Sequence, residues 1–402
     1  VVNYRFITKT AKSLNVKSSQ AHVFGSIIPT SLATWNSPSR LTINSSTMSK
    51  TRESHKIQRT LCIGLGGTGR DVLMQIRRLI IDRYGKLDAL PVVSFVHIDA
   101  DKGAGNLSGL RTGSTYRGEN ILLTPAERVI STMKSQEIDE LIRGLEQRGE
   151  LDRRSPYEHI GRWLPPQLIR NVTAIEDGAG GIRPVGRLSF FHNYQKIKEV
   201  IQAAEYRTRR HEQTLMERGL IVEPGLNIFV VGSLCGGTGS GMFLDVAYSL
   251  RQAYGDIKNQ LIGYWIVSPE LYGNTPSMNA NTYAALKELN HYAASNTRFQ
   301  ACYDPQHLVN IDSERPPFDF TYIVSNKTAS DYKINDKDKL CNVIAHKIFL
   351  DFGDELTTVI KSQKDNFKDK LTRLDNHPRR NVQRYLTFGL AKVYVPQDRI
   401  IQ

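Results

Sequence analysis

The sequence predicts an α/β protein with a doubly wound, mostly parallel sheet and a helical insertion. Apolar runs of strand length alternate with segments of helical periodicity along most of the chain. Val92–Ile98 is an apolar run with β-branched residues, typical of a strand that is buried on both faces. Glycine-rich segments stand between a strand and a helix at two places, as they do in ligand-binding α/β proteins.

The first elements form a βαβ unit. Leu61–Ile63 is a short apolar run that leads directly into glycines. Asp71–Tyr84 follows, with apolar residues at the spacing of one helix face. Val92–Ile98 then completes the unit as a second strand, which a parallel sheet requires.

The remaining elements continue the alternation. Further strands are predicted at Asn227–Val231, Leu261–Val267, Phe320–Val324 and Tyr385–Val395. Further helices are predicted at Pro125–Leu145 (one or two), Leu188–Met216, Met242–Tyr254, Asn279–Ala294 and Leu340–Lys361. No internal repeat is evident.

Composition excludes several classes of protein. The chain has 402 residues, of which 40% are hydrophobic and 23% charged, so it can bury a sizeable core. Its four cysteines are far apart and contain no CxxC pair, which excludes a disulfide scaffold and disfavours a zinc ribbon. No apolar stretch approaches the ~20 residues of a spanning helix. These features lead us to expect a cytoplasmic protein.

The positive charge is concentrated at one end. The formal net charge is +13, and residues 1–60 hold nine Lys or Arg and one acid, a balance of +8 that leaves +5 for the rest. We therefore expect no nucleic-acid partner for the folded body. Residues 1–47 are rich in Ser and Thr and acid-free, which fits a transit peptide or a natural start at Met48. Little fixed structure is expected before about Lys56.

The expected organisation has three parts. Residues 1–57 are a disordered or non-native extension, and 58–396 are one nucleotide-binding domain with a helical insertion at about 105–170. Residues 397–402 are expected to begin a truncated C-terminal region.

Three loops concentrate the glycines, and we name them by their order: loop 1 is 64–69, loop 2 is 178–181 and loop 3 is 233–241. Glycine permits positive φ and close approach of backbone amides to an anion, and a following helix adds its positive end. Loop 1 alone also fits a tight strand–helix turn, or a dinucleotide fingerprint. In the latter reading Asp99 would bind a ribose, and the chain would be an NAD(P)-dependent oxidoreductase. Loop 3 favours instead two strand ends that converge on one polyphosphate.

The loops resemble the phosphate-binding motifs of the tubulin/FtsZ superfamily. SLCGGTGSGM (233–242) is similar to the highly specific motif [G/S]-x-GGGTG[S/T]G and departs from it at Cys235. GLGGTGRDVL (64–73), GAGGIRPVG (178–186) and HIDAD (97–101) resemble other nucleotide-binding loops of FtsZ, in the same order. IRPVGR (182–187), NANTYAALKEL (279–289) and RYLTFGLAKVYVP (384–396) look typical of the bacterial and archaeal tubulin-like group.

The resemblance implies binding of GTP or GDP with Mg²⁺. The implied phosphate-binding residues are Gly64, Gly66, Gly67, Thr68 and Gly69 in loop 1, Ala179, Gly180 and Gly181 in loop 2, and Cys235, Gly236, Gly237, Thr238, Gly239 and Ser240 in loop 3. Valine at Gly237 or Gly239 is expected to block binding by filling the space of the phosphates. Cys235 is more simply a tolerated small residue than a reactive thiol.

Other residues are candidates for the remaining contacts. Arg183 and Arg187 either neutralise phosphate charge or pair with helix acids. Asp99 and Asp101 either hold Mg²⁺ through water or cap a strand end. Candidates for base and ribose contacts are Asp71, where FtsZ has Asn, together with Asn279, Asn281, Asn335 and Asp336. A solvated helix start explains the last two equally well.

Hydrolysis is the weakest part of the resemblance. In the superfamily an acid from the next subunit completes the catalytic site, which implies head-to-tail self-association. The corresponding region here, LTRLDNHPRRN (371–381), lacks the NxDxxD pattern and offers Asp375 as the nearby acid. The resemblance therefore implies slow GTP hydrolysis and a cytoskeletal or membrane-remodelling role, with membrane contact only indirect. A nucleotide-dependent scaffold without hydrolysis remains an alternative.

Overall fold

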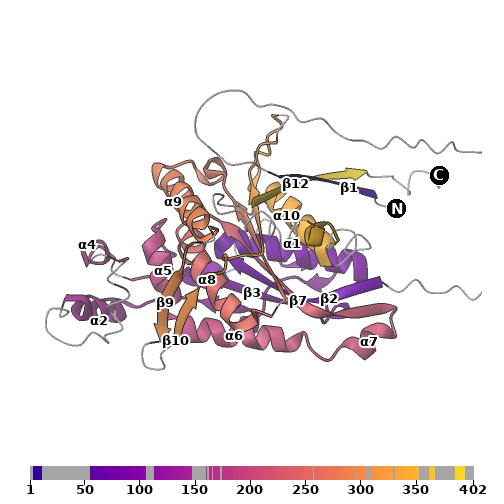
Figure 1. Ribbon diagram of the computed structural model, residues 1–402, viewed down its shortest axis with the longest axis horizontal. Helices are drawn as coiled ribbons and strands as arrows, with labels where there is room; N and C mark the ends of the chain where they lie inside the picture. The colour runs from indigo at the N-terminus through magenta and orange to yellow at the C-terminus, as the bar shows by residue number, and fades with distance from the viewer. Residues whose placement is uncertain are drawn as a thin grey trace, which may run out of the picture.

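The computed structural model describes residues 3–10, 55–105, 113–146, 160, 163–164, 166–172, 174–256, 258–294, 296–304, 309–328, 331–352, 362–366 and 385–393. Figure 1 shows helices on both sides of one large sheet. The strands are β1 (Asn3–Thr10), β2 (His55–Leu65), β3 (Val93–Asp99), β4 (Thr115–Tyr116), β5 (Glu119–Asn120), β6 (Arg128–Ile130), β7 (Leu220–Ser233), β8 (Gln260–Ile266), β9 (Phe299–Asp304), β10 (Val309–Ser313), β11 (Phe320–Val324) and β12 (Tyr385–Val393). The α-helices are α1 (Gly66–Tyr84), α2 (Ser135–Glu146), α4 (Pro166–Ile169), α5 (Arg183–His192), α6 (Tyr194–Arg207), α7 (Glu212–Met216), α8 (Thr238–Tyr254), α9 (Pro276–Tyr292) and α10 (Lys337–Phe352), and the short 3₁₀ turns are Leu87–Ala89, Lys102–Gly105, Pro125–Glu127 and Pro269–Tyr272.

The main sheet confirms the predicted doubly wound topology. Its described strands follow the order β1-β12-β11-β8-β7-β2-β3-β6, and all pairs are parallel except β1 with β12. From β2 the chain first adds β3 and β6 on one side and then returns to add β7, β8, β11 and β12 on the other. The direction of winding therefore reverses between β2 and β7, where the carboxyl ends of the two strands leave a crevice.

Two apolar layers hold the sheet. α1 and α10 cover one face, whereas α5, α6, α8 and α9 lie on the other (Figure 1). The side chains of β2 alternate between the two layers: Leu61 and Ile63 are buried against α6 and α8, and Cys62 is buried against α1. Because both faces are covered, the strands are buried along most of their length, as expected for a parallel sheet.

The structure corrects several predicted elements. The segment Pro125–Leu145 is not wholly helical, since Arg128–Ile130 forms the edge strand β6 on β3. A three-residue strand shows no sequence period, and it is set by the hydrogen bonds that β3 offers. The predicted helix Leu188–Met216 is three helices, with a break at Asn193 between α5 and α6. The hairpin β9–β10 was not predicted.

The N-terminal segment also differs from expectation at one place. Little fixed structure was expected before Lys56, yet Asn3–Thr10 forms β1, which pairs antiparallel with β12 over eight residues. β12 is otherwise an edge strand with unpaired backbone groups, and β1 supplies their partners. None of the described helices is long and apolar enough to cross a membrane.

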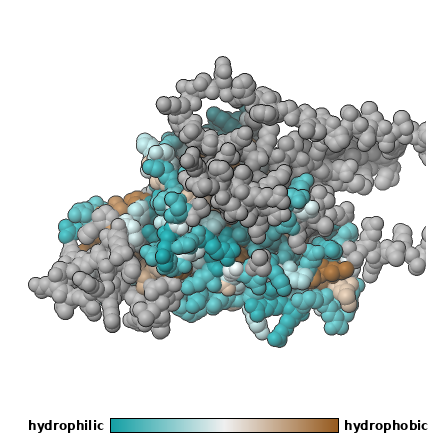
Figure 2. All heavy atoms as spheres, viewed as in Figure 1, coloured by the Kyte–Doolittle hydropathy of each residue, from teal (hydrophilic) through white to brown (hydrophobic). Residues whose placement is uncertain are grey.

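The described surface is largely hydrophilic, as Figure 2 shows for one face. One of the brown patches in Figure 2 is at the end of the molecule where α7 lies, and the exposed apolar residues there include Met216 and Ile221.

Candidate functional site

Loop 1 is the junction between β2 and α1. β2 ends at Leu65 and α1 begins at Gly66, whose φ of 66° requires glycine. Gly64 and Gly69 pack backbone on backbone, because a Cβ built on Gly69 would lie 2.6 Å from the Cα of Gly64. These two glycines therefore fix the close approach of the helix to the strand.

Loop 3 connects β7 to α8 and lies beside loop 1. A Cβ built on Gly66 would lie 3.7 Å from the Cβ of Thr238, the first residue of α8. Neither α1 nor α8 has a side-chain cap, and neither has an acid in its first turn. Two helix N-termini with uncapped amides thus meet at the switch point of the sheet, where their dipoles favour an anion.

Loop 2 lies on a third side of the site that loops 1 and 3 form. Gly178, Gly180 and Gly181 all have positive φ, between 57° and 85°, which makes glycine necessary there. Loop 2 packs on loop 3, because a Cβ built on Gly237 would lie 2.8 Å from both the Cβ of Ala179 and the amide nitrogen of Ile182. The three loops therefore form one continuous backbone rim.

The side chain of Asn281 connects two of the loops of this rim by hydrogen bonds. It is buried on α9, and its Nδ2 donates to the carbonyls of Gly181 at 2.7 Å and Cys235 at 3.1 Å. One amide group thereby links loop 2 to loop 3. Asn279, the other candidate on this helix, is exposed and donates to Asn274 and to the carbonyl of Thr275 at the start of α9.

Some glycines of the rim face open space. Among the described residues, no heavy atom lies within 4 Å of a Cβ built at Gly67, Gly180, Gly181 or Gly236. By contrast, a Cβ on Gly237 or Gly239 would meet the protein's own backbone within 2.9 Å. The expected reason for the valine effect at Gly237 and Gly239 is therefore wrong: these positions are needed for packing between and within the loops.

Cys235 and Ser240 are buried beneath the rim. Burial raises the pKa of the Cys235 thiol, whose Sγ lies 3.8 Å from the carbonyl of Ile266. The thiol is therefore a packing group that is kept protonated. The hydroxyl of Ser240 accepts a hydrogen bond from Arg183 at 2.8 Å, so it is already engaged in joining α5 to α8.

Both candidate arginines pair with helix acids. Arg183 is bound to Glu288 on α9 as well as to Ser240. Arg187 donates hydrogen bonds from Nε and Nη2 to Asp245 on α8 and lies over the ring of Trp163 at 4.5 Å. Burial is the largest single influence and would lower the pKa of the Arg187 guanidinium, but the charge and hydrogen bonds of Asp245, together with Tyr303 and Glu288, raise it. The sequence allowed two roles for Arg183 and Arg187, phosphate binding or pairing with helix acids, and these ion pairs correspond to the second role.

The candidate acids lie around the rim. Asp71 on α1 is buried and pairs with Arg70 and with Lys337 at the start of α10, the latter at 2.7 Å. Asp99 ends β3, with one carboxylate oxygen 3.6 Å from Nε2 of His97. Asp101 accepts from the amide of Gly103 and lies against Gly178 of loop 2. Asp99 and Asp101 thus stand at the strand end beside loops 1 and 2.

The remaining candidates do not reach the rim through any described contact. Asp336 accepts from the amide of Asp338 and so caps the start of α10, and Asn335 is exposed. Asp375 lies outside the described residues. The described part of the chain holds no group of three or more His, Cys, Asp or Glu that could bind a metal by itself.

Two residues near the rim, Tyr272 and His97, were not candidates from sequence, and Asn281 was predicted only as a base or ribose contact. Tyr272 follows β8, and its hydroxyl lies 3.0 Å from Oγ1 of Thr68 in loop 1. His97 is fully buried, with Nε2 3.2 Å from the carbonyl of Gly66. Asn281 and Asn279 lie in the same sequence motif, and the motif does not distinguish their roles. Only the tertiary structure, which brings β3, the segment after β8 and helix α9 to the same loops, identifies all three.

Comparisons with known proteins give one match over most of the chain. A family model described as "Tubulin like" matches residues 61–402. No curated protein matches.

Solved structures also resemble the chain. They include CetZ1 from Haloferax volcanii as a GDP-bound monomer, with 13% identity and a TM-score of 0.39 over 72% of this chain and 58% of that one. CetZ2 from the same organism, in a GTPγS-bound protofilament, has 14% identity and a TM-score of 0.41 over 77% of this chain and 64% of that one. CetZ from Methanosaeta thermophila has 15% identity and a TM-score of 0.40 over 73% of this chain and 53% of that one.

Proposed function

The chain belongs to the tubulin-like family, and on that premise we propose that it binds a guanine nucleotide by its phosphates at the rim of loops 1, 2 and 3. The observation that carries the proposal is the meeting of two uncapped helix N-termini, those of α1 and α8, beside glycines that face open space. Such a site offers amide donors and positive dipole ends without side chains, which suits a polyphosphate.

In this proposal each loop contacts a different part of the polyphosphate. Amides of Gly236, Gly237 and Thr238 would hold the α- and β-phosphates, and Gly67 would approach from loop 1. Loop 2 would lie by the terminal phosphate. Since the described residues contain no metal-binding cluster of their own, Mg²⁺ would be held mainly by phosphate oxygens and water, with Asp99 and Asp101 at the strand end beside it. The metal would neutralise charge on the phosphates.

Slow hydrolysis and head-to-tail self-association complete the proposal. The superfamily's arrangement, in which an acid from the next subunit completes the site, supports both. A cytoskeletal role would follow from such assembly. Guanine selectivity depends on the family alone, because the described contacts leave Asn279 and Asp336 engaged at their own helix starts.

The test is a competition between nucleotides. Fluorescent N-methylanthraniloyl GTP is titrated with and without Mg²⁺, and unlabelled GTP, ATP and NAD are used as competitors. GTP should displace the probe at the lowest concentration. Displacement by NAD alone would overturn the proposal in favour of the dehydrogenase alternative.

A second measurement addresses hydrolysis and assembly. Phosphate release is followed over a series of protein concentrations. A rate per molecule that rises with concentration is expected if one subunit completes the site of another. GTP binding with no phosphate release at any concentration would leave a nucleotide-dependent scaffold as the correct description.

A further inference from the structure

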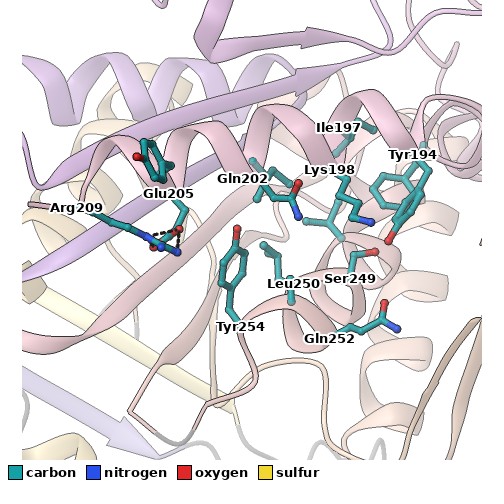
Figure 3. Close-up of a pocket in the computed structure, with 15 residues that line it drawn as sticks. Tyr194, Ile197, Lys198, Gln202, Glu205, Arg209, Ser249, Leu250, Gln252 and Tyr254 are labelled. Carbon is teal, nitrogen blue, oxygen red and sulfur yellow. Dashed lines mark hydrogen bonds and ion pairs between the residues drawn. The ribbon is translucent and has the colours of Figure 1, made fainter. Parts of the chain in front are cut away.

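A cavity between α6 and α8 is not used by the proposed nucleotide site. Its volume is about 690 Å³, within the range of small-molecule pockets. α8 begins at loop 3, and the cavity lies against its last turns, between Val246 and Tyr254. Figure 3 shows the two helices as opposite walls of this space.

The floor of the cavity is apolar. Ile197 and Ile201 of α6 face Val246 and Leu250 of α8, and Phe190 of α5 also lines the cavity. All five side chains belong to the core on this face of the sheet and are buried, so the floor is a fixed part of the fold. It can accept the apolar body of a ligand without rearrangement.

One end of the cavity carries a free positive charge. Lys198 points from α6 toward α8 (Figure 3) and is half-buried. Within the described residues, Lys198 has no hydrogen bond or ion pair. Ser249 points toward it from α8 (Figure 3), and its buried Oγ also has no hydrogen-bond partner in the described structure. A buried hydroxyl without a partner costs free energy, which a polar ligand group would recover.

Among the described residues, the other end of the cavity has no free negative charge. Glu205 is buried, but Arg59 binds it at 2.8 Å and Arg209 at 2.6 Å (Figure 3 draws the second pair). Burial, with the neighbouring charge of Glu205, raises the pKa of Tyr254 to about 12, so its hydroxyl stays neutral at pH 7. The charged lining residues that the structure describes are Lys198, Arg209 and Glu205, and their net charge is positive.

We propose that this cavity binds a small amphipathic anion, with its apolar body between α6 and α8 and its carboxylate or sulfonate on Lys198 and Ser249. The charge of the lining selects an anion, and the buried Ile and Leu side chains select an apolar body. This site is separate from the nucleotide rim, because none of the residues of loops 1, 2 and 3 lines it.

The test uses two fluorescent probes that differ in charge. 8-Anilino-1-naphthalenesulfonate is an anion, and N-phenyl-1-naphthylamine is its uncharged analogue. Lys198→Met should weaken the anionic probe about tenfold, the loss of one charge-assisted contact, and should change binding of the neutral probe less than twofold. Arg207→Met removes the same charge from an exposed position of α6 that does not line the cavity, and it should change neither probe.

A second pair of variants tests the location. Ala253→Phe places a ring at the mouth of the cavity and should weaken both probes, whereas Ala203→Phe on the exposed side of α6 should weaken neither. Thermal unfolding and GTP binding are measured for all four variants and should stay at the wild-type level. Equal affinity of wild type, Lys198→Met and Ala253→Phe for the anionic probe would overturn the proposal, and it would leave the nucleotide site untouched.

Discussion

The glycines of the rim are of two kinds, those required by packing and those that face open space. Gly237 and Gly239 allow segments of backbone to touch, so they are required by packing. Gly67 and Gly236 face open space among the described residues, and Gly236 does not adopt positive φ, so a side chain there meets no obstacle within the protein. The two kinds can be separated by experiment.

Gly236→Val should abolish ligand binding without unfolding the protein. The valine side chain projects into the space that the proposed phosphates occupy, so affinity for GTP should fall by about 100-fold or more, roughly 2.7 kcal/mol. The midpoint of urea unfolding without nucleotide should stay close to the wild-type value.

Gly237→Ala is the matched control. Its Cβ would lie 2.8 Å from Ala179, so the substitution should cost about 1–3 kcal/mol of folding free energy through overpacking. If Gly236→Val bound GTP as tightly as the wild type, the open face of loop 3 would not be the phosphate site.

Helices α5, α8 and the β9–β10 hairpin are joined by one buried carboxylate. The side chain of Asp245 is 2% exposed and accepts hydrogen bonds from Arg187 of α5 and from the hydroxyl of Tyr303 of β9. α5 also reaches α8 closely because Gly186 and Gly241 lack side chains at their contact. At the level of elements, this junction holds loop 2 against loop 3.

Asp245→Asn should loosen this junction. The substitution leaves the Arg187 guanidinium without its charge partner, and breaking a buried pair in this way costs about 3 kcal/mol. Tyr303→Phe removes only one neutral donor and should cost about 1 kcal/mol. Urea unfolding followed by circular dichroism measures both.

The exposed pair Arg298–Asp312 on the same hairpin provides the control. Asp312→Asn should leave the unfolding midpoint unchanged, because exposed ion pairs contribute little. Similar losses for Asp245→Asn and Asp312→Asn would show that the junction does not depend on the buried charge.

At the scale of the whole molecule, a buried charged cluster attaches α10 to the sheet. Lys347 is fully buried and pairs with Asp351, which also binds Lys364 at 3.0 Å and the hydroxyl of Tyr264 at 2.6 Å. Lys347 further lies over the ring of Tyr322 at 5.0 Å. Burial, only partly offset by Asp351, lowers the pKa of Lys347 to about 8.

Lys347 should therefore contribute stability that rises between pH 8 and about 10. The unfolded lysine keeps a proton up to its ordinary pKa of about 10.4, so over this window this side chain binds more protons in the unfolded state than in the folded one. Burial raises the pKa of the Cys62, Cys235 and Cys341 thiols, and these groups contribute an opposing fall over the same window. Burial raises the pKa of Tyr264 and Tyr322 above 10, and this opposing effect lowers stability at higher pH. The pKa of Asp351 is lowered, since the two lysines outweigh its burial, so its contribution is lost only in acid.

Lys347→Met tests whether Lys347 is the source of this pH dependence. Asp351 keeps Lys364 as its partner, so the protein should still fold. The free energy of unfolding is measured by urea titration at pH 7.5 and 9.5. The stability difference between wild type and variant should shift in favour of the wild type at the higher pH, because the opposing cysteines are present in both proteins. An equal pH dependence in both proteins would rule out Lys347 as the source.

Local patterns predicted much of the fold. The α/β class, the strands β2, β3, β7, β8 and β11, and helix α9 follow from apolar periodicity. The short edge strand β6, the strand β1 and the hairpin β9–β10 were missed, because their pairing depends on partners far along the chain. The break at Asn193 was also missed, since apolar spacing continues through it.

The sequence by itself determined the family, the glycine loops and their order, because these depend on residue types that lie next to one another in the chain. Only the tertiary structure decided which glycines face open space, which acids pair with Arg183 and Arg187, and that Asn281 rather than Asn279 links two loops. Each of these depends on strand ends that are brought together by the sheet. A parallel sheet places residues about a hundred or more positions apart, such as Gly66 and Thr238, within van der Waals reach, and no local spacing encodes that contact.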